Sequence, residues 1–131
     1  MSDNHNILER LVELEKAAQD YGFDWPDPQM IIDHAISECE EIKDAIKTGD
    51  KKDIQSEIGD LIHVSISLCI FLGYDVKETI YNSFKKFHTR MSAVKDEADK
   101  LGLDSLDGQS IDFILDLWNK AKDKEESLKA T

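Results

Sequence analysis

Residues 57–72 read EIGDLIHVSISLCIFL and form the most apolar run in the chain. On a helix, Glu57 and Asp60 lie three residues apart, on the same side as a row of apolar residues. That row consists of Leu61, Val64, Leu68 and Phe71. Burying an unpaired carboxylate is strongly unfavourable, so two acids at the head of a core helix require a specific use. The stretch therefore predicts a buried helix that carries a functional acid pair.

The preceding helix carries a second acid pair. In the segment ISECEEIKDAI, Glu38 and Glu41 are also three residues apart and lie beside an apolar stripe, whereas Glu40 points away to solvent. A short turn at 48–50 makes the two helices antiparallel, and 15 residues separate Glu41 from Glu57. We expect this arrangement to bring the two acid pairs level with each other.

Four carboxylates in one pocket repel one another and raise one another's pKa values unless cations neutralise them. Hard divalent ions with oxygen ligands, Mg²⁺ or Mn²⁺, meet this requirement. The sequence therefore predicts a metal site formed by Glu38, Glu41, Glu57 and Asp60. The alternative is that all four are ordinary surface acids. Two pairs on consecutive helices, each next to an apolar stripe, favour the metal site.

The size and charge of the chain limit the classes of protein to which it can belong. Its 131 residues fit a single domain over 1–131, and a hydrophobic share of 40% is enough for a core. The formal net charge of −12 argues against nucleic-acid binding, which needs a basic face. It does not forbid an anionic ligand, provided that metal ions bridge the ligand and the protein.

The cysteines and the apolar runs indicate the compartment. Cys39 and Cys69 fall in apolar helical patterns and are too few for a disulfide framework, which favours reduced thiols in a cytoplasm. The first residues are charged and lack an apolar signal core, and the longest apolar run, 61–72, is too short to span a bilayer. We therefore expect a soluble cytoplasmic protein without a membrane partner.

Helical periodicity predicts an all-α bundle of four to five antiparallel helices. Asp27 is the expected N-cap of the second helix, Pro28 its first residue and Gly49 its end. The core helices are expected within about 5–98, as a first helix to about 20, then 28–48, 51–72 and 76–98. A loop over 99–110 then precedes a C-terminal helix over about 110–124.

The third of these helices is apolar nearly all round, because Ile58, Ile62 and Ile66 point away from the row described above. Such a helix is central and buried on every side, and one small bundle covers it poorly. We therefore expect self-association, as a homodimer or alternatively as a tetramer. The other possibility is a monomer that wraps this helix well.

The fourth helix adds the complementary charge. Lys86 and Arg90 lie one turn apart, at the flank of a stripe that contains Phe84, Phe87 and Met91. Cationic donors beside a metal site suit phosphate oxygens, and a guanidinium group offers a fork of them. Alternatively, the two cations pair with acids of neighbouring helices.

Taken in order, these residues resemble the MazG family of nucleoside triphosphate pyrophosphohydrolases. The family pattern is E-E-x-x-E, then E-x-G-D-L-L, then K-F-x-x-R. It appears here as SECEE at 37–41, EIGDLI at 57–62 and KFHTR at 86–90. Residues 22–26, GFDWP, and 117–122, LWNKAK, look like segments of the C-terminal half of two-repeat MazG proteins, so the resemblance covers nearly the whole chain.

The resemblance implies Mg²⁺-dependent hydrolysis of a nucleoside triphosphate at its α–β bond, which yields a nucleoside monophosphate and pyrophosphate. One Glu that is not fully used in coordination would act as the base. The usual role of the family is house-cleaning of aberrant or excess nucleotides. The implied residue roles are metal binding and catalysis for Glu38, Glu41, Glu57 and Asp60, phosphate binding for Lys86 and Arg90, and a place near the base for Trp118.

Three residues depart from the family pattern. Ser37 stands in place of the first Glu and bears on one metal contact. Phe84 replaces an Asn that often helps to bind the substrate, and His63 replaces an apolar residue. The last two differences bear on the nucleotide preference rather than on the reaction.

Two other classes of protein stay open. His63 follows Asp60 by three residues and His34 precedes Glu38 by four, a layout similar to carboxylate bundles that bind two iron or manganese ions. Those bundles use Glu-x-x-His on two helices, which this sequence lacks, and His63 is alternatively a hydrogen-bonded core residue. The third class is a non-catalytic helical module that binds a partner through its apolar surface.

Overall fold

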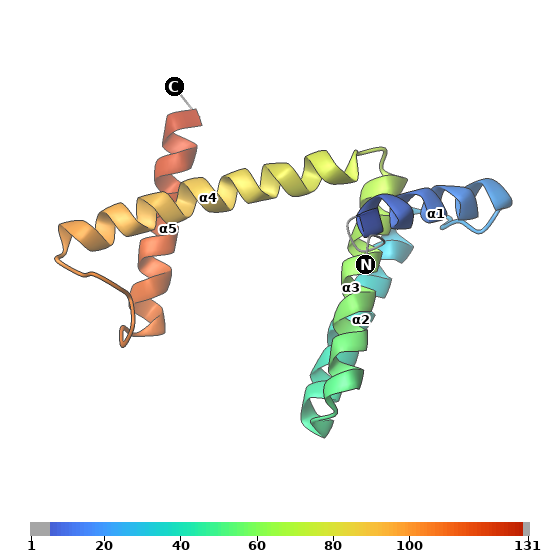
Figure 1. Ribbon diagram of the computed structural model, residues 1–131, viewed down its shortest axis with the longest axis horizontal. Helices are drawn as coiled ribbons and strands as arrows, with labels where there is room; N and C mark the ends of the chain where they lie inside the picture. The colour runs from blue at the N-terminus through green and yellow to red at the C-terminus, as the bar shows by residue number, and fades with distance from the viewer. Residues whose placement is uncertain (1–5, 130–131) are drawn as a thin grey trace. The chain divides into compact units, whose positions relative to one another are not determined.

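The computed structural model describes residues 6–129, and within this range it contains helices and no strand (Figure 1). The five helices are α1 (Ile7–Tyr21), α2 (Pro28–Thr48), α3 (Lys51–Phe71), α4 (Val76–Lys100) and α5 (Ile111–Lys129). The all-α prediction and the five helices are confirmed. The loop between α4 and α5 also lies where the sequence predicts it.

The ends of α2 follow from local chemistry. The carboxylate of Asp27 accepts a hydrogen bond from the Met30 N–H at 2.9 Å, and Pro28 occupies the first turn. At the other end Gly49 adopts the left-handed conformation with φ 74°, and its N–H reaches two carbonyls of the last turn. Both predicted ends of α2 are confirmed, and the short turn that follows leads directly into α3.

The C-terminal helix is longer than its sequence pattern predicts. It continues to Lys129, beyond the expected end at about 124. Glu125 explains the extra turn, because it bonds to Arg90 of α4 at 3.3 Å and lies 3.6 Å from Lys129 on its own helix. The polar residues after 124 are therefore helical because Glu125 has one partner on α4 and another on its own helix, which the composition of this segment does not reveal.

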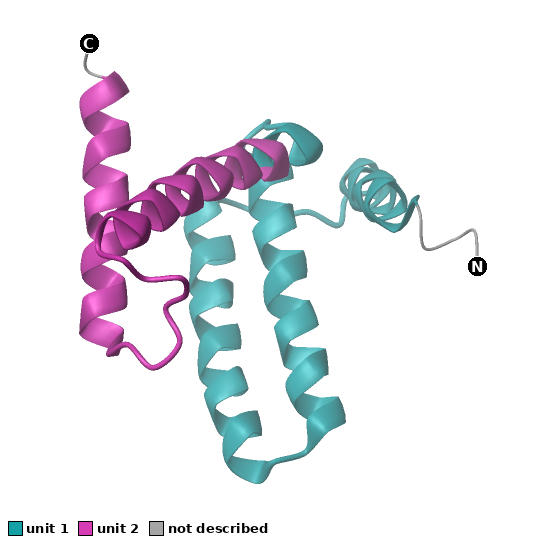
Figure 2. Ribbon diagram, turned by 60° about the vertical axis from the view of Figure 1, so that its left-hand side comes forward, with its two compact units in different colours: residues 1–79 teal, residues 80–131 magenta. Residues whose placement is uncertain are grey.

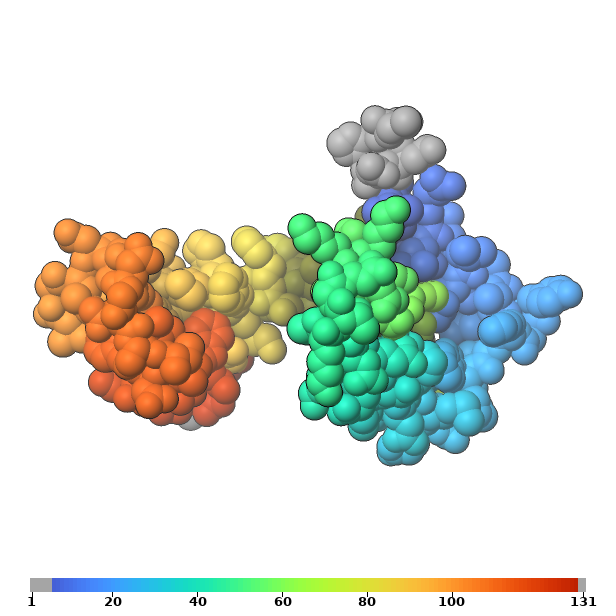
Figure 3. Space-filling model, turned by 90° about the horizontal axis from the view of Figure 1, so that it is seen from below, coloured from blue at the N-terminus to red at the C-terminus, as the bar shows by residue number. Residues whose placement is uncertain are grey.

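The chain forms two compact units, residues 1–79 and 80–131 (Figure 2). In the first unit α2 and α3 lie side by side as an antiparallel hairpin, and α1 packs against α3. In the space-filling view from below, the atoms of α2 and α3 lie against each other at the turn end of the hairpin (Figure 3). The buried apolar residues of this unit are Ile31, Ala45, Val64, Ile66 and Val76.

The second unit has its own small core where α5 crosses α4. Val94, Leu117 and Ala121 are buried there, and Met91 and Phe113 pack against them. The predicted single domain over 1–131 stays a prediction, since each unit carries a separate set of buried residues.

Within one chain α3 is not buried on every side, in line with the expectation that one small bundle covers it poorly, and self-association stays a prediction. Ile58 is 42% exposed and Ile62 is 57% exposed. Only α2 and α1 pack closely against this helix, so the side that carries these two residues faces solvent. With a mean hydropathy of 1.3, α3 is also long and apolar enough to cross a membrane, a test that core helices of soluble proteins pass too.

Candidate metal centre

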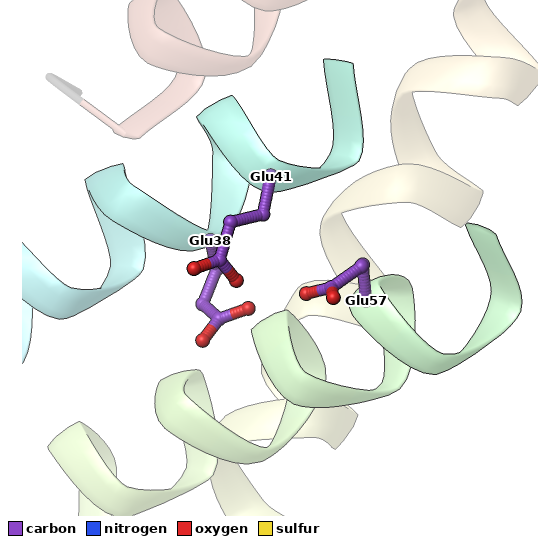
Figure 4. A group of neighbouring side chains, drawn as sticks. All are labelled: Glu38, Glu41 and Glu57. Atoms are coloured by element: carbon purple, nitrogen blue, oxygen red, sulfur yellow. The ribbon is translucent and has the colours of Figure 1, made fainter. Parts of the chain in front are cut away.

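Three of the four predicted acids meet between the helices of the hairpin. Glu38 and Glu41 come from α2 and Glu57 from α3, and one carboxylate oxygen of each lies within 4.8 Å of the others. Figure 4 shows the three side chains pointing toward one another. The short turn after α2 sets the register that makes the acids level, as the sequence predicts.

Asp60 lies at the edge of this group. It is exposed and does not belong to the 4.8 Å cluster, although it is one turn further along α3. The negative charge of Asp60 nevertheless acts on the cluster, because it is one of the causes that raise the pKa of Glu38. The structure therefore brings three acids into contact and places the fourth beside them.

The three glutamates do not all carry a charge in the metal-free protein. Burial is the largest cause that raises the pKa of Glu38, which is only 5% exposed, and its hydrogen bond with Glu41 adds to this. A hydrogen bond with Glu41 is the largest cause that raises the pKa of Glu57, from 4.5 to about 7. Two carboxyl groups can share a hydrogen bond only if one is protonated, and the raised pKa values of Glu38 and Glu57 therefore favour a proton held within the cluster.

The cluster also contains two oxygens without partners. Glu38 Oε2 and Glu57 Oε2 are buried and accept no hydrogen bond from any described residue. Buried oxygens of this kind are rare in proteins unless an ion or a water satisfies them. An all-carboxylate donor set with unsatisfied oxygens fits a hard divalent cation, which would replace the proton and neutralise the repulsion.

His34 and His63 do not belong to this cluster of three glutamates. His34 Nε2 lies 3.3 Å from Glu38 Oε1, where it can orient the carboxylate. His63 Nε2 lies 3.3 Å from Glu15 Oε2 of α1. His63 is thus hydrogen-bonded as one alternative predicts, but it is half-exposed and does not belong to a core.

A cavity of about 650 Å³ opens beside the carboxylates. Its walls come from α1, the turn at 23–26, α2 and α3, and they include Glu38 and Asp60. Trp25 forms part of the wall, with its ring centroid 5.5 Å from that of His34. The sequence gives no local signal for this cavity, because only the packing of α1 against α3 brings Glu15 to His63.

The basic residues belong to the second unit. Arg90 pairs with Glu125 of α5 at 3.3 Å, and its guanidinium lies 5.6 Å from the centre of the Trp118 ring. Its Nε is buried and has no acceptor among the described residues. For Arg90 the structure therefore shows the alternative in which it pairs with an acid of a neighbouring helix. Lys86 is exposed, and no ion pair joins it to any residue within 6–129.

The fold and the site define an all-α protein with a carboxylate cluster suited to a divalent cation. Residues 27–95 match the MazG nucleotide pyrophosphohydrolase domain, more than half of the chain. The chain belongs to the MazG family. The matched range includes the four predicted acids, Lys86 and Arg90, whereas Trp118 lies outside it.

Two curated relatives support this assignment. The nucleoside triphosphate pyrophosphohydrolase/pyrophosphatase MazG of Thermotoga maritima is 29% identical over 114 residues, which cover 87% of this chain and 43% of the relative. The nucleoside triphosphate pyrophosphohydrolase of Escherichia coli K12 is 24% identical over 123 residues, which cover 92% of this chain and 46% of the relative. The chain thus spans less than half the length of either relative.

Proposed function

We propose that this chain hydrolyses nucleoside triphosphates at the bond between the α and β phosphates, releasing a nucleoside monophosphate and pyrophosphate with the help of Mg²⁺. The observation that carries the proposal is the cluster of Glu38, Glu41 and Glu57 with its two unsatisfied buried oxygens. The proposal also agrees with the names of the relatives from Thermotoga maritima and Escherichia coli.

In this proposal the three clustered glutamates and Asp60 hold the metal. A bound Mg²⁺, or Mn²⁺ in its place, would polarise phosphoryl oxygens, lower the pKa of a coordinated water and balance the charge of the leaving pyrophosphate. Lys86 and Arg90 bind the phosphates in this proposal, with the exposed side chain of Lys86 accessible to them. Trp118 lies near the base of the nucleotide in this proposal. The cellular role that we propose is the removal of aberrant or excess nucleotides.

We further propose a cytoplasmic homodimer as the working form. Apolar side chains of α2 and α3 remain at the surface of a single chain, among them Ile32, Ile36, Ile58 and Ile62. Exposed apolar patches of this kind often mark protein–protein contacts. A second copy that covers them would bury α3 on the sides that one chain leaves open.

The direct test is the release of pyrophosphate from a panel of standard and modified triphosphates in the presence of Mg²⁺. Glu57→Gln is expected to lower turnover by at least about a hundredfold, the scale of losing an electrostatic group at the reacting centre. Glu40→Gln is the matched control on the opposite side of α2. Glu40 is exposed and its Lys43 partner is on its own helix, so this change is expected to leave the rate unaltered.

The same experiment separates hydrolysis from the other classes. A partner-binding module would release no pyrophosphate from any triphosphate in the panel, with or without Glu57→Gln. Thermal unfolding provides a readout besides activity, because a ligand present at 100 times its Kd stabilises the folded state by about 2.7 kcal/mol. Mg²⁺ should raise the unfolding midpoint of the unaltered chain, and lack of any rise would count against the metal site.

A further inference from the structure

We propose that the cavity next to the carboxylate cluster is the nucleoside subsite, where Trp25 stacks on the base and Glu15 selects bases that carry an exocyclic amino group. This inference rests on the proposed function, since it gives the cavity to the nucleoside part of the same triphosphate. Of the cavity wall, the attack on the phosphates uses the carboxylates alone, so the rest of the cavity is available for the nucleoside.

The position and size of the cavity fit this use. Glu38 and Asp60 belong to its wall and also to the predicted metal site, so phosphates held at the carboxylates leave the nucleoside at the cavity. Its volume of about 650 Å³ lies within the usual range for small-molecule sites. None of the described wall residues is Lys or Arg, so the cavity suits the uncharged part of a nucleotide better than its phosphates.

Trp25 offers a fixed aromatic face. The backbone N–H of Trp25 donates to the carboxylate of Asp24 at 2.8 Å, and the residues that follow are fixed by the cap that Asp27 forms on α2. The ring is half-buried and lies 5.5 Å from the His34 ring at an interplanar angle of 52°. His34 in turn contacts Glu38, so a single side chain separates Trp25 from the carboxylate cluster.

Glu15 supplies the selective group. Its side chain is 15% exposed, and Oε2 lies 3.3 Å from His63, which fixes the carboxylate at the wall. A carboxylate has two acceptor oxygens, so Glu15 can also accept a hydrogen bond from a bound base. Carboxylates accept from the exocyclic amino group of cytosine, whereas a carbonyl at the same position of uracil would meet a second acceptor. The wall therefore favours amino-bearing bases over uracil and thymine.

Intrinsic fluorescence tests the stacking, because the chain has two tryptophans, Trp25 and Trp118. Trp118→Phe keeps an aromatic ring at the position placed near the base above, and it leaves Trp25 as the only tryptophan of the chain, so that its emission reports on Trp25. We expect non-hydrolysable α,β-imido dCTP with Mg²⁺ to change its emission saturably. Trp25→Leu should raise the Kd of this analogue about tenfold, within the range for loss of one stacked base. Tyr21→Leu is the control, because Tyr21 is 92% exposed and does not belong to the cavity wall; its Kd should not change.

A matched ligand pair tests the selectivity. The imido analogues of dCTP and dUTP differ in the base only: cytosine carries an amino group at C4 and an unprotonated N3, whereas uracil carries a carbonyl at C4 and an N3–H. The unaltered chain should bind the dCTP analogue at least about fivefold more tightly, the lower end of the effect of one good base contact. Glu15→Gln should bring the ratio of the two Kd values close to one, because an amide both donates and accepts.

The outcomes also separate this inference from the proposed function. One outcome would overturn the proposed subsite and support the hydrolysis. In it, the chain releases pyrophosphate, the emission of Trp25 does not change with the analogue, and Trp25→Leu leaves the Kd unchanged. A Trp25 response without pyrophosphate release would support the subsite and overturn the hydrolysis. Equal affinity for the two analogues in the unaltered chain would overturn the role of Glu15. Should Trp25→Leu fail to fold, the emission of Trp118→Phe decides alone.

Discussion

Glu57 shows how a side chain with an ordinary sequence context acquires an unusual property. It follows a polar segment of α3, and only the folded hairpin brings it to Glu41 and Glu38. The hydrogen bond with Glu41, partial burial and the charges of both neighbours all raise its pKa, to about 7. Near neutral pH the metal-free cluster is therefore close to a change of charge.

This shift predicts how the stability of the metal-free protein depends on pH. The folded chain holds a proton on Glu57 that the unfolded chain releases above about pH 4.5. Because the folded state binds more protons, the free energy of unfolding should fall as the pH rises from about 4.5 to about 7. Thermal unfolding in EDTA across this window should show a falling midpoint, and the raised pKa of Glu38 acts in the same direction.

Glu57→Gln should flatten this dependence and raise the midpoint above pH 7, since an amide keeps the hydrogen bond without the charge. Glu40→Gln should retain the slope of the unaltered chain, because Glu40 lies outside the cluster and is exposed. An equal slope in both variants would show that the pH dependence arises elsewhere.

At the level of elements, the turn between α2 and α3 determines how the acid pairs meet. Gly49 ends α2 with φ 74°, a conformation that other residues adopt only with strain. Gly59 contrasts with it, because it lies inside α3 with an ordinary φ and nothing within 4 Å of the place a Cβ would take.

These two glycines form a pair of opposite predictions. Gly49→Ala should lower the free energy of unfolding by about 1 kcal/mol or more, the penalty for a Cβ in the left-handed region. Gly59→Ala should raise it by about 0.5–1 kcal/mol, the difference between the two residues inside a helix. Urea unfolding of both variants measures whether the free energy of unfolding falls or rises in each. Destabilisation by Gly59→Ala would indicate that another chain covers this part of α3.

The Arg90–Glu125 pair holds α5 to α4. Both side chains are mostly buried, and the Arg90 guanidinium also lies against Trp118. Glu125→Gln should lower the free energy of unfolding by about 1–3 kcal/mol, because it leaves a buried guanidinium without its counter-charge. Hydrogen exchange should speed up in α5 before it does in α2 and α3. Glu126→Gln, at an exposed neighbouring position, is the control that should change neither quantity.

The elements were more predictable than their assembly. The caps of α2, the acid spacing and the short turn are local, so the helices and the meeting of Glu38, Glu41 and Glu57 follow from the sequence. The contact of Glu15 with His63 depends on how α1 packs, which no local pattern encodes. For the same reason the extra turn of α5 was missed, since the ion pair of Glu125 with α4 is a tertiary contact.

At the level of the whole molecule, the exposed apolar side of α3 predicts a stable dimer. Sedimentation should give twice the mass of one chain for the unaltered protein. Ile62→Lys should shift it toward the monomer, because a charge at this exposed position of α3 would be buried in the interface. Leu101→Lys, at an exposed position after α4, should leave the mass unchanged. A monomer in the unaltered protein would contradict the homodimer.

The position of the carboxylate cluster within the single hairpin of α2 and α3 has a kinetic consequence. Its ligands come together by closing a short loop, which loses little chain entropy, and contacts between near neighbours in sequence form fast. A cation that binds this hairpin would thus act before α4 and α5 are in place. Mg²⁺ should therefore speed refolding in stopped-flow experiments more than it slows unfolding. The ion proposed for the reaction would then also help the chain to reach its native state.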